Sequence, residues 1–392
     1  MREQAEWDVA VIGGGPAGLS AAQAAAAAGA RTVILERAEH PRYKTCGGGL
    51  IGASLSAVRD LPVLPARDEI RAVTFTLRGG HDFTRSEAAP ILTMVMREEF
   101  DAALLERALA AGAEIRQQAM VRGIAQDDGQ VTVRLGGGST VTASVVVGAD
   151  GSAGITARHV GVTFDQVDLG LELEIAVPGP VQREWAGRVL LDWGKIPGSY
   201  GWVFPKGDRL TVGVIASRRS DQVTAGSGKQ GDATRDYLRD FVGRLGLAGY
   251  EAVRDSGHLT RCRSGDSPLR KGRVIVAGDA AGLLEPWTRE GISFALRSGA
   301  LAGELAAKAA TAADESPLGE YATAIDRGLG AEMRAGRLLL TAYTRHAGTF
   351  HRGLASAKGW GAFVRLCRSE LLYPEIVSKP AVRMALSLLN RV

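Results

Sequence analysis

Three cysteines occur among the 392 residues, at Cys46, Cys262 and Cys367, and no two of them form a C-x-x-C pair. This spacing argues against a disulfide framework, a structural zinc site and an iron–sulfur cluster, so we expect no metal site. No Ser/Cys–His arrangement accompanies Cys46, which argues against a hydrolytic nucleophile. In the segment HPRYKTCGGGL it precedes three glycines, where either a thiol with a chemical role or a small residue in a tight turn would fit.

A glycine motif near the N-terminus could bind the phosphates of a dinucleotide. Val9–Ile12 is a short apolar run typical of a buried parallel strand, and GGGPAG follows it directly. In a G-x-G-x-x-G turn, Gly13 permits the sharp bend, Gly15 lets a pyrophosphate approach the main chain, and Gly18 lets the next helix pack against the strand. The alanine-rich run 17–28 favours that helix, whose N-terminus attracts an anion.

An acid ends the next apolar run, RTVILE. Glu36 stands 18 residues after Gly18, where its carboxylate can accept hydrogen bonds from an adenosine ribose. Arg37 follows directly, but an acid at the end of this strand favours a ribose with a free 2′-hydroxyl. The unit therefore predicts a Rossmann-like domain that binds FAD or NAD rather than NADP.

Two later carboxylates favour FAD. Asp150 follows the β-branched run in VTASVVVGADGS, and Asp279 follows the apolar run in GRVIVAGDAAG, with a helix expected from about Gly291. A carboxylate at the C-terminal end of a parallel strand, beside a helix N-terminus, suits the ribityl chain and the pyrophosphate of FAD. For Asp150 a purely structural role in a turn stays open.

These segments resemble the flavoprotein hydroxylase superfamily. GADGS and GDAAG…P…EGI follow the N-terminal motif in the order typical of that superfamily, and MREEFDAALLERA resembles its R-x-x-F/L-D segment. The resemblance covers residues 8 to about 305. It implies that Arg97, Asp279 and Gly291 contact FAD and that Asp150 supports the nucleotide end. A charge on a helix surface is the alternative for Arg97.

An alternating aromatic segment, GSYGWVFPKGDRLTVGV, predicts two antiparallel strands joined at PKGD. Tyr200, Trp202 and Phe204 would then point to one face of a strand. By periodicity alone this face belongs to an apolar core. Three aromatic side chains would also suit the wall of an apolar tunnel.

The aromatic segment and PRYKTCGGGL resemble the geranylgeranyl reductase family, whose members are FAD enzymes that saturate isoprenoid double bonds. The resemblance implies that Cys46 and its glycines lie near the isoalloxazine ring and that the three aromatic residues line the prenyl pocket. The chain departs from the family at Trp287 and at Arg289, which stands where T-G-E-G-I has glycine, so the substrate stays open. The FAD-binding residues expected are Gly13, Gly15, Ala17, Gly18, Glu36, Arg37, Cys46, Gly47, Gly48, Arg97, Asp150, Asp279, Gly291 and Ile292.

The reaction implied is hydride transfer from N5 of reduced flavin to a C=C bond of geranylgeranyl diphosphate, a prenyl lipid or a menaquinone-type side chain. An isolated alkene accepts hydride only if a proton reaches it, and the alkene must lie within about 3–3.5 Å of N5 in a dry tunnel. Cys46 is the candidate proton donor, although a role in shaping the flavin pocket or in packing stays open. Lys206, just after the aromatic strand, could bind a diphosphate or simply belong to the turn.

The electron donor and two other functions remain open. LGGGST at 135–140 is typical of a hairpin turn rather than of a second dinucleotide site, so the reductant would be transiently bound NAD(P)H or reduced ferredoxin. A flavin-dependent monooxygenase of an aromatic or polyketide substrate would not explain CGGGL and YGWVFPKG. The absence of cluster cysteines weighs against an electron-transfer flavoprotein that reduces quinone.

We expect an α/β protein with a Rossmann-like FAD-binding domain, an inserted antiparallel-sheet substrate domain and a C-terminal helical region. The expected boundaries are 1–65, 96–165 and 268–315 for the FAD-binding domain, 66–95 and 166–267 for the substrate domain, and 316–392 for the helical region.

The C-terminal tail is basic. Residues 331–392 hold ten Lys or Arg and three acids, while the net charge of the whole chain is +4. Such a tail favours an anionic partner, for which we consider a membrane surface but not nucleic acid; a solvated helix face or helices packed on the FAD domain are the alternatives. No secretory signal or apolar run of about 20 residues is evident. We expect a cytoplasmic protein, with peripheral contact at the inner face of the cell membrane left open.

Overall fold

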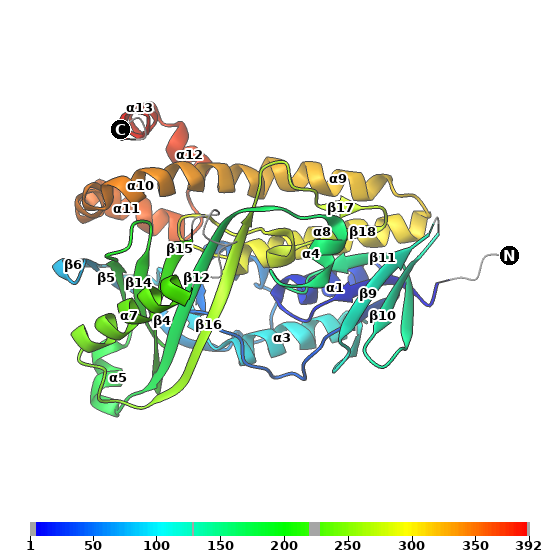
Figure 1. Ribbon diagram of the computed structural model, residues 1–392, viewed down its shortest axis with the longest axis horizontal. Helices are drawn as coiled ribbons and strands as arrows, with labels where there is room; N and C mark the ends of the chain where they lie inside the picture. Colours follow the sequence, from blue (N-terminus) through cyan, green and yellow to red (C-terminus); the bar gives the residue numbers. More distant parts are fainter. Residues whose placement is uncertain (1–4, 128, 219–227, 390–392) are drawn as a thin grey trace.

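The computed structural model of the protein describes residues 5–127, 129–218 and 228–389. A mixed sheet with parallel strands at its centre forms one half of the molecule (Figure 1). Its strands are β1 (Trp7–Ile12), β2 (Thr32–Leu35), β8 (Glu114–Arg116), β9 (Val121–Gln126), β10 (Val131–Leu135), β11 (Thr140–Gly148), β17 (Arg270–Lys271) and β18 (Val274–Val276). β1 pairs in parallel with β2 and β11, and β11 pairs in parallel with β18, so distant segments bring their C-terminal ends to one edge.

Helices cover this sheet. The helices are α1 (Pro16–Ala27), α3 (Arg97–Ala110), α4 (Ile155–Val160), α8 (Ile292–Ala312) and α9 (Ser316–Ile325), and a 3₁₀ turn, η1 (Gly278–Ala281), follows β18. α1 and α8 pack on each other and on β1, and glycines of α8 allow the two helices to approach closely. An added Cβ on Gly303 of α8 would lie 2.0 Å from the carbonyl oxygen of Ala21, so this close approach requires glycine.

An antiparallel sheet forms the other half of the molecule (Figure 1). Its strands, in spatial order, are β16 (Ala252–Arg263), β12 (Phe164–Ala176), β15 (Arg209–Arg218), β14 (Tyr200–Pro205), β13 (Arg188–Trp193), β5 (Ala72–Leu77) and β6 (Gly80–Ser86). β5 joins it in parallel to β13, and the other neighbours run antiparallel. α5 (Gly179–Trp185) and α7 (Gly228–Arg244) cover one face, where Tyr237 and Phe241 are buried.

A small sheet holds the segment after Cys46 in place. It consists of β3 (Gly49–Leu50), β7 (Leu92–Val95) and β4 (Ala66–Ile70), and α2 (Gly52–Ala57) follows β3. β3 pairs with β7, so the glycine turn at 47–49 is tied to the strand that leads into α3.

The C-terminal helices extend from the mixed sheet to the antiparallel sheet (Figure 1). After the π-helical turn η2 (Asp326–Gly330) come α10 (Ala331–Ala355), α11 (Ala357–Cys367), α12 (Tyr373–Ser378) and α13 (Pro380–Leu389). Tyr343 of α10 donates a hydrogen bond to the carbonyl oxygen of Ser199 at 2.7 Å, which joins α10 to the start of β14. Among the described helices, none is both long and apolar enough to cross a bilayer. The expected fold class is confirmed.

Candidate active site

A cavity of about 890 Å³ joins the ends of the parallel strands to the antiparallel sheet and the C-terminal helices. At what we call the nucleotide end, the lining residues belong to the turn 13–17, to the segments after β2, β11 and β18, and to the start of α3. At what we call the apolar end, they belong to β13, β14, the loop 284–290 and α10–α12. The volume lies in the range of ligand sites, and the two ends suit a nucleotide and an apolar chain.

The turn 13–17 leaves open space for a phosphate. Gly13 has a φ of 108°, which favours glycine, and an added Cβ there would lie 2.3 Å from the carbonyl oxygen of Ala149. At Gly15, by contrast, the nearest atom to an added Cβ would be Nη2 of Arg42 at 3.6 Å, so a ligand can approach the main chain. The turn leads directly into α1, with Ala17 in its first turn, and a helix N-terminus favours an anion.

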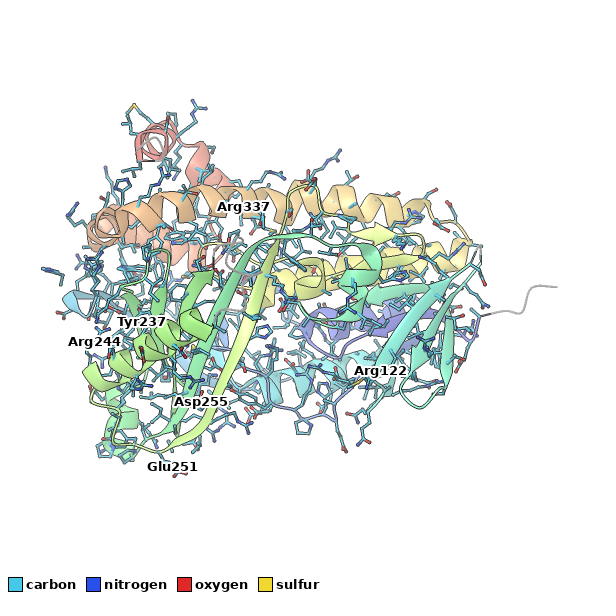
Figure 2. The ribbon with its side chains drawn as sticks, viewed as in Figure 1. Arg122, Tyr237, Arg244, Glu251, Asp255 and Arg337 are labelled. Atoms are coloured by element: carbon cyan, nitrogen blue, oxygen red, sulfur yellow. The ribbon has the colours of Figure 1, made fainter. Side chains whose placement is uncertain are left out.

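Glu36 lies at the C-terminal end of β2. Its buried carboxylate accepts hydrogen bonds from the main-chain N–H groups of Gly14 and Ala38, at 2.5 and 2.8 Å. These bonds hold the carboxylate against the glycine turn, where an adenosine ribose would lie. Arg37 and Arg122 are exposed and line the same end, and Arg122 lies on the side of the molecule away from the C-terminal helices (Figure 2).

Arg97 is buried at the start of α3 rather than exposed on its surface. Its Nε and Nη2 atoms donate to the two carboxylate oxygens of Asp101, each at 2.8 Å, and Nη1 of Arg42 lies 3.2 Å from the same carboxylate. Burial opposes the charge of Arg97, but Asp101 outweighs burial, so the pKa of Arg97 is raised. Arg97 and Arg42 therefore line the cavity as cations and suit a pyrophosphate.

The two carboxylates that follow β11 and β18 have different partners. Asp150 lines the cavity and accepts hydrogen bonds from the main-chain N–H of Thr156, at 3.2 Å, and from its hydroxyl, so it also holds the first turn of α4. Oδ2 of Asp279 lies 3.6 Å from Nε2 of His258. Burial opposes ionisation of Asp279, but His258 and Lys44 outweigh it and its pKa is lowered. Asp279 is thus an ionised acceptor on the cavity wall.

The N-terminus of α8 also reaches the cavity, where Gly291 and Ile292 line the wall. The carboxylate of Glu290 accepts hydrogen bonds from the main-chain N–H and the hydroxyl of Ser293, at 2.7 and 2.5 Å. These bonds fix the first turn of the helix, so that its positive end faces a ligand.

Two buried side chains hold the main chain of Cys46 from both sides. Oε1 of Glu172, on β12, accepts a hydrogen bond from the N–H of Cys46 at 2.8 Å, and Nζ of Lys206 donates to its carbonyl oxygen at 3.1 Å. The N–H of Gly48 donates to the sulfur of Cys46 at 3.4 Å. Gly48 has a φ of 73°, and an added Cβ would lie 2.2 Å from the carbonyl oxygen of Val95. Position 48 therefore requires glycine, because its backbone conformation and its contact with Val95 leave no room for a Cβ atom.

Lys206 lies beneath this turn rather than at an exposed position. Its residue is 2% exposed, and Nζ also lies 4.0 Å from Oε1 of Glu174. The pKa of Glu172 is raised by burial, although Lys206 and the N–H of Cys46 oppose the shift. Because Lys206 is absent from the described cavity wall, its ammonium group is not placed to meet a diphosphate there.

Three aromatic side chains of β14 lie on one face and line the cavity. The ring centroids of Tyr200 and Trp202 are 5.9 Å apart, and those of Trp202 and Phe204 are 6.3 Å apart. An added Cβ on Gly47 would lie 2.8 Å from the ring of Phe204, so the glycine turn packs directly against this wall. The Tyr200 hydroxyl donates to the carbonyl oxygen of Thr288.

The C-terminal helices contribute lining residues that the sequence analysis did not identify. Phe350, Phe363, Tyr373 and Ile376 lie on the wall of the apolar end. The apolar spacing in GWGAFVRLC indicates a buried face, but it does not show what that face covers. His258 was missed as well, since a lone histidine in a strand carries no recognisable motif.

The residues at the nucleotide end fit FAD. FAD has a pyrophosphate between the adenosine ribose and the ribityl chain. The open main chain at Gly15 and the cations Arg42 and Arg97 match the pyrophosphate, and the carboxylates Glu36 and Asp279 match the hydroxyl groups on its two sides.

Comparisons with known proteins agree with this geometry. The family described as FAD binding domain matches residues 6–327. Digeranylgeranylglycerophospholipid reductase 1 of Methanopyrus kandleri is 32% identical over 323 residues, which cover 79% of this chain and 83% of that protein. Chloroplastic geranylgeranyl diphosphate reductase of Oryza sativa is 30% identical over 344 residues, covering 81% of this chain and 71% of that protein.

Solved structures share the fold. A geranylgeranyl bacteriochlorophyll reductase-like protein of Thermoplasma acidophilum superposes with a TM-score of 0.76 at 21% identity, covering 98% of this chain and 99% of that chain. A flavin-dependent brominase superposes with a TM-score of 0.75 at 19% identity, with the same coverage.

The fold and the site define an oxidoreductase that uses FAD. Within that class, the chain belongs to the geranylgeranyl reductase family of FAD-dependent oxidoreductases. The family expected from PRYKTCGGGL and YGWVFPKG is confirmed.

Proposed function

We propose that this enzyme saturates C=C bonds of an isoprenoid chain, with FAD at the nucleotide end of the cavity and the chain at its apolar end. The observation that carries the proposal is the continuity of the cavity, in which residues suited to a dinucleotide and an aromatic wall enclose the same volume. Similarity to proteins named as reductases of geranylgeranyl compounds supports the same substrate class.

We assign the FAD contacts from the chemistry of each lining group. The glycine turn, Arg42 and Arg97 would hold the pyrophosphate, Glu36 the adenosine ribose and Asp279 the ribityl chain. Segment 46–48 and the N-terminus of α8 would border the isoalloxazine ring. When bound and reduced, FAD supplies a hydride from N5.

The apolar end would hold the alkene and exclude water. An isolated alkene is electron-rich and accepts hydride only as a cation develops on it, so proton and hydride must arrive in one dry site. Trp202 and Phe204 on one side and Phe350 and Phe363 on the other supply an apolar wall. Reacting atoms held within about 3–3.5 Å would gain the benefit of fixed orientation.

Cys46 is the proton donor that we propose. The bonds from Glu172 and Lys206 fix its main chain, and the packing of Gly47 on Phe204 brings the turn to the apolar end. Transfer of the thiol proton to the less substituted alkene carbon, with hydride to the other carbon, adds two hydrogens. Once the saturated product has left, water that enters the cavity would return the proton to the thiolate and leave hydroxide.

Two further parts of the proposal concern partners. The glycine turn before α1 is filled by FAD in this proposal, so the reductant, NAD(P)H or a ferredoxin-type protein, would reach the flavin from outside. A lipid substrate would be taken up at a membrane surface. α13 supports this because it exposes Met384 and Leu388, 66% and 62% exposed, close in sequence to the exposed Lys379 and Arg383.

Anaerobic reoxidation tests the reaction. We expect the FAD-loaded enzyme, reduced chemically without oxygen, to be reoxidised by geranylgeranyl diphosphate, a prenylated quinone or a prenyl lipid extract, with a product two hydrogens heavier. Cys46→Ala should keep FAD bound but reoxidise far more slowly. If every prenyl compound leaves the flavin reduced, the proposed function is wrong. It is also wrong if, in a separate assay in air with NAD(P)H, substrate addition causes oxygen uptake instead.

A further inference from the structure

Arg289 occupies an unusual position in the wall of the cavity. It stands where the related motif T-G-E-G-I has glycine. Its backbone φ is 58°, a value that residues other than glycine rarely adopt. Its residue is only 8% exposed. The guanidinium carbon lies 5.8 Å from the ring centroid of Tyr200, so the cation adjoins the aromatic wall of β14.

The guanidinium group is only partly satisfied. Nε donates to Oδ2 of Asp168 at 3.0 Å, and Nη1 donates to the carbonyl oxygen of Trp287 at 2.6 Å. Nη2 is buried and has no hydrogen-bond partner among the described residues. An unsatisfied buried donor and a left-handed backbone both cost stability, so a ligand oxygen that accepts from Nη2 would account for an arginine at this position.

The charge of Arg289 is already balanced. Asp168 is fully buried, and its Oδ1 atom accepts a hydrogen bond from the hydroxyl of Ser217 at 2.7 Å. Arg289 is the only lysine or arginine among the described residues that line the apolar end. An ionised diphosphate placed there would lose its hydration, and the ion pair of Arg289 and Asp168 carries no net positive charge that could compensate for this loss.

We propose that Arg289 recognises an uncharged oxygen of the substrate through Nη2, so the compound that enters the apolar end is a neutral prenyl compound with a carbonyl or hydroxyl group. This inference rests on the proposed function and narrows its substrate class. It places the oxygen-bearing end inside the cavity beside Tyr200, and it excludes a diphosphate from that end.

Binding to the oxidised holoenzyme tests this without turnover. The probes share a farnesyl chain: farnesylacetone carries a ketone, farnesene carries no oxygen, and farnesyl diphosphate carries the anion. Quenching of tryptophan fluorescence reports binding, because Trp193, Trp202 and Trp287 line the cavity. We expect the ketone to bind about tenfold more tightly than farnesene, as a hydrogen bond from a charged donor allows, and more tightly than the diphosphate.

Variants assign the effect to Arg289. In Arg289→Gly the preference for the ketone over farnesene should disappear. Because that change leaves Asp168 buried without its partner, Arg289→Gly/Asp168→Asn should be measured beside it and should show the same loss. Arg244→Met is the matched control, since Nη2 of Arg244 lies 3.3 Å from the buried carboxylate of Asp192. Arg244 lies at the end of α7 (Figure 2), and no described residue of α7 lines the cavity. This control should keep the full preference.

Three results would overturn the inference. The first is equal affinity of the wild-type enzyme for ketone and hydrocarbon, and the second is tighter binding of the diphosphate. The third is a shifted flavin absorption spectrum or midpoint potential in ligand-free Arg289→Gly with an unchanged preference, because Nη2 would then serve the flavin. An enzyme that shows the preference but reduces no prenyl compound would instead refute the proposed function alone.

Discussion

At the scale of single residues, the main chain of Cys46 is held by charged groups that come from a different sheet. Glu172 and Lys206 bind its N–H and its carbonyl oxygen, and Glu174 accompanies Lys206 at 4.0 Å. A buried ammonium group requires hydrogen-bond acceptors and a nearby carboxylate, because burial removes its contacts with water. Lys206 therefore supports a segment of the described cavity wall from behind, without lining the cavity itself.

Lys206→Met should loosen the turn around Cys46. The carbonyl oxygen of Cys46 would lose its donor, so we expect the free energy of unfolding to fall by about 1–3 kcal/mol and the thiol to be alkylated faster in the holoenzyme. FAD should stay bound. Peptide mapping after timed alkylation measures the rate at Cys46 separately from Cys262 and Cys367.

Arg209→Met is the matched control for this prediction. Arg209 lies 3.2 Å from the other carboxylate oxygen of Glu174 and makes no contact with Cys46 in the described structure. It should leave the alkylation rate unchanged. Equal rates in both variants would show that Lys206 only stabilises the sheet.

At the scale of elements, the alanine and glycine content of α1 and α8 determines how closely the two helices pack and where their N-termini lie in the FAD-binding half. The two helices pack with glycines of α8 against main-chain carbonyl groups of α1, which places the N-termini of both helices at the cavity. Larger side chains would separate the helices and move both N-termini. The composition therefore serves packing as much as helix propensity.

Gly303→Ala should disturb this contact. Its Cβ would lie 2.0 Å from the carbonyl oxygen of Ala21, a main-chain atom that cannot move freely, so we expect a loss of about 1–3 kcal/mol in the free energy of unfolding and weaker FAD retention. Gly361→Ala, in the middle of α11, is the control because no atom lies within 4 Å of an added Cβ. That variant should gain about 0.5–1 kcal/mol. Denaturant unfolding and flavin content measure both, and two variants of equal stability would contradict the packing argument.

At the scale of the whole molecule, the two sheets form part of the cavity wall and the C-terminal helices complete it. α10 crosses from the FAD-binding half to the antiparallel sheet, and α12 and α13 stand out from the body (Figure 1). The same part of the chain holds the basic excess and two of its most exposed apolar side chains, Met384 and Leu388. A basic, apolar surface next to the apolar end of the cavity suits uptake from an anionic lipid surface.

Met384→Asp/Leu388→Asp should weaken vesicle binding. Each side chain would lose the favourable transfer of a large apolar group into lipid, so we expect at least about a tenfold loss of affinity for vesicles rich in phosphatidylglycerol. Val63→Asp is the control, because Val63 is 75% exposed but lies between α2 and β4. Co-sedimentation measures binding, and flavin content checks folding. Equal binding of the variant and the control would contradict membrane contact through α13.

The sequence by itself determined the features that depend on neighbouring residues. Apolar runs, the G-x-G-x-x-G turn, Glu36 and the alternation of Tyr200, Trp202 and Phe204 follow from local sterics and from strand and helix periods, and they led to the FAD fold and the family. Only the tertiary structure decided that Lys206 is buried under Cys46, that Arg289 pairs with Asp168, 121 residues away, and that α10–α12 complete the cavity. Such contacts depend on where the chain returns in space, and burial then decides whether a charged side chain meets solvent, a partner or a ligand.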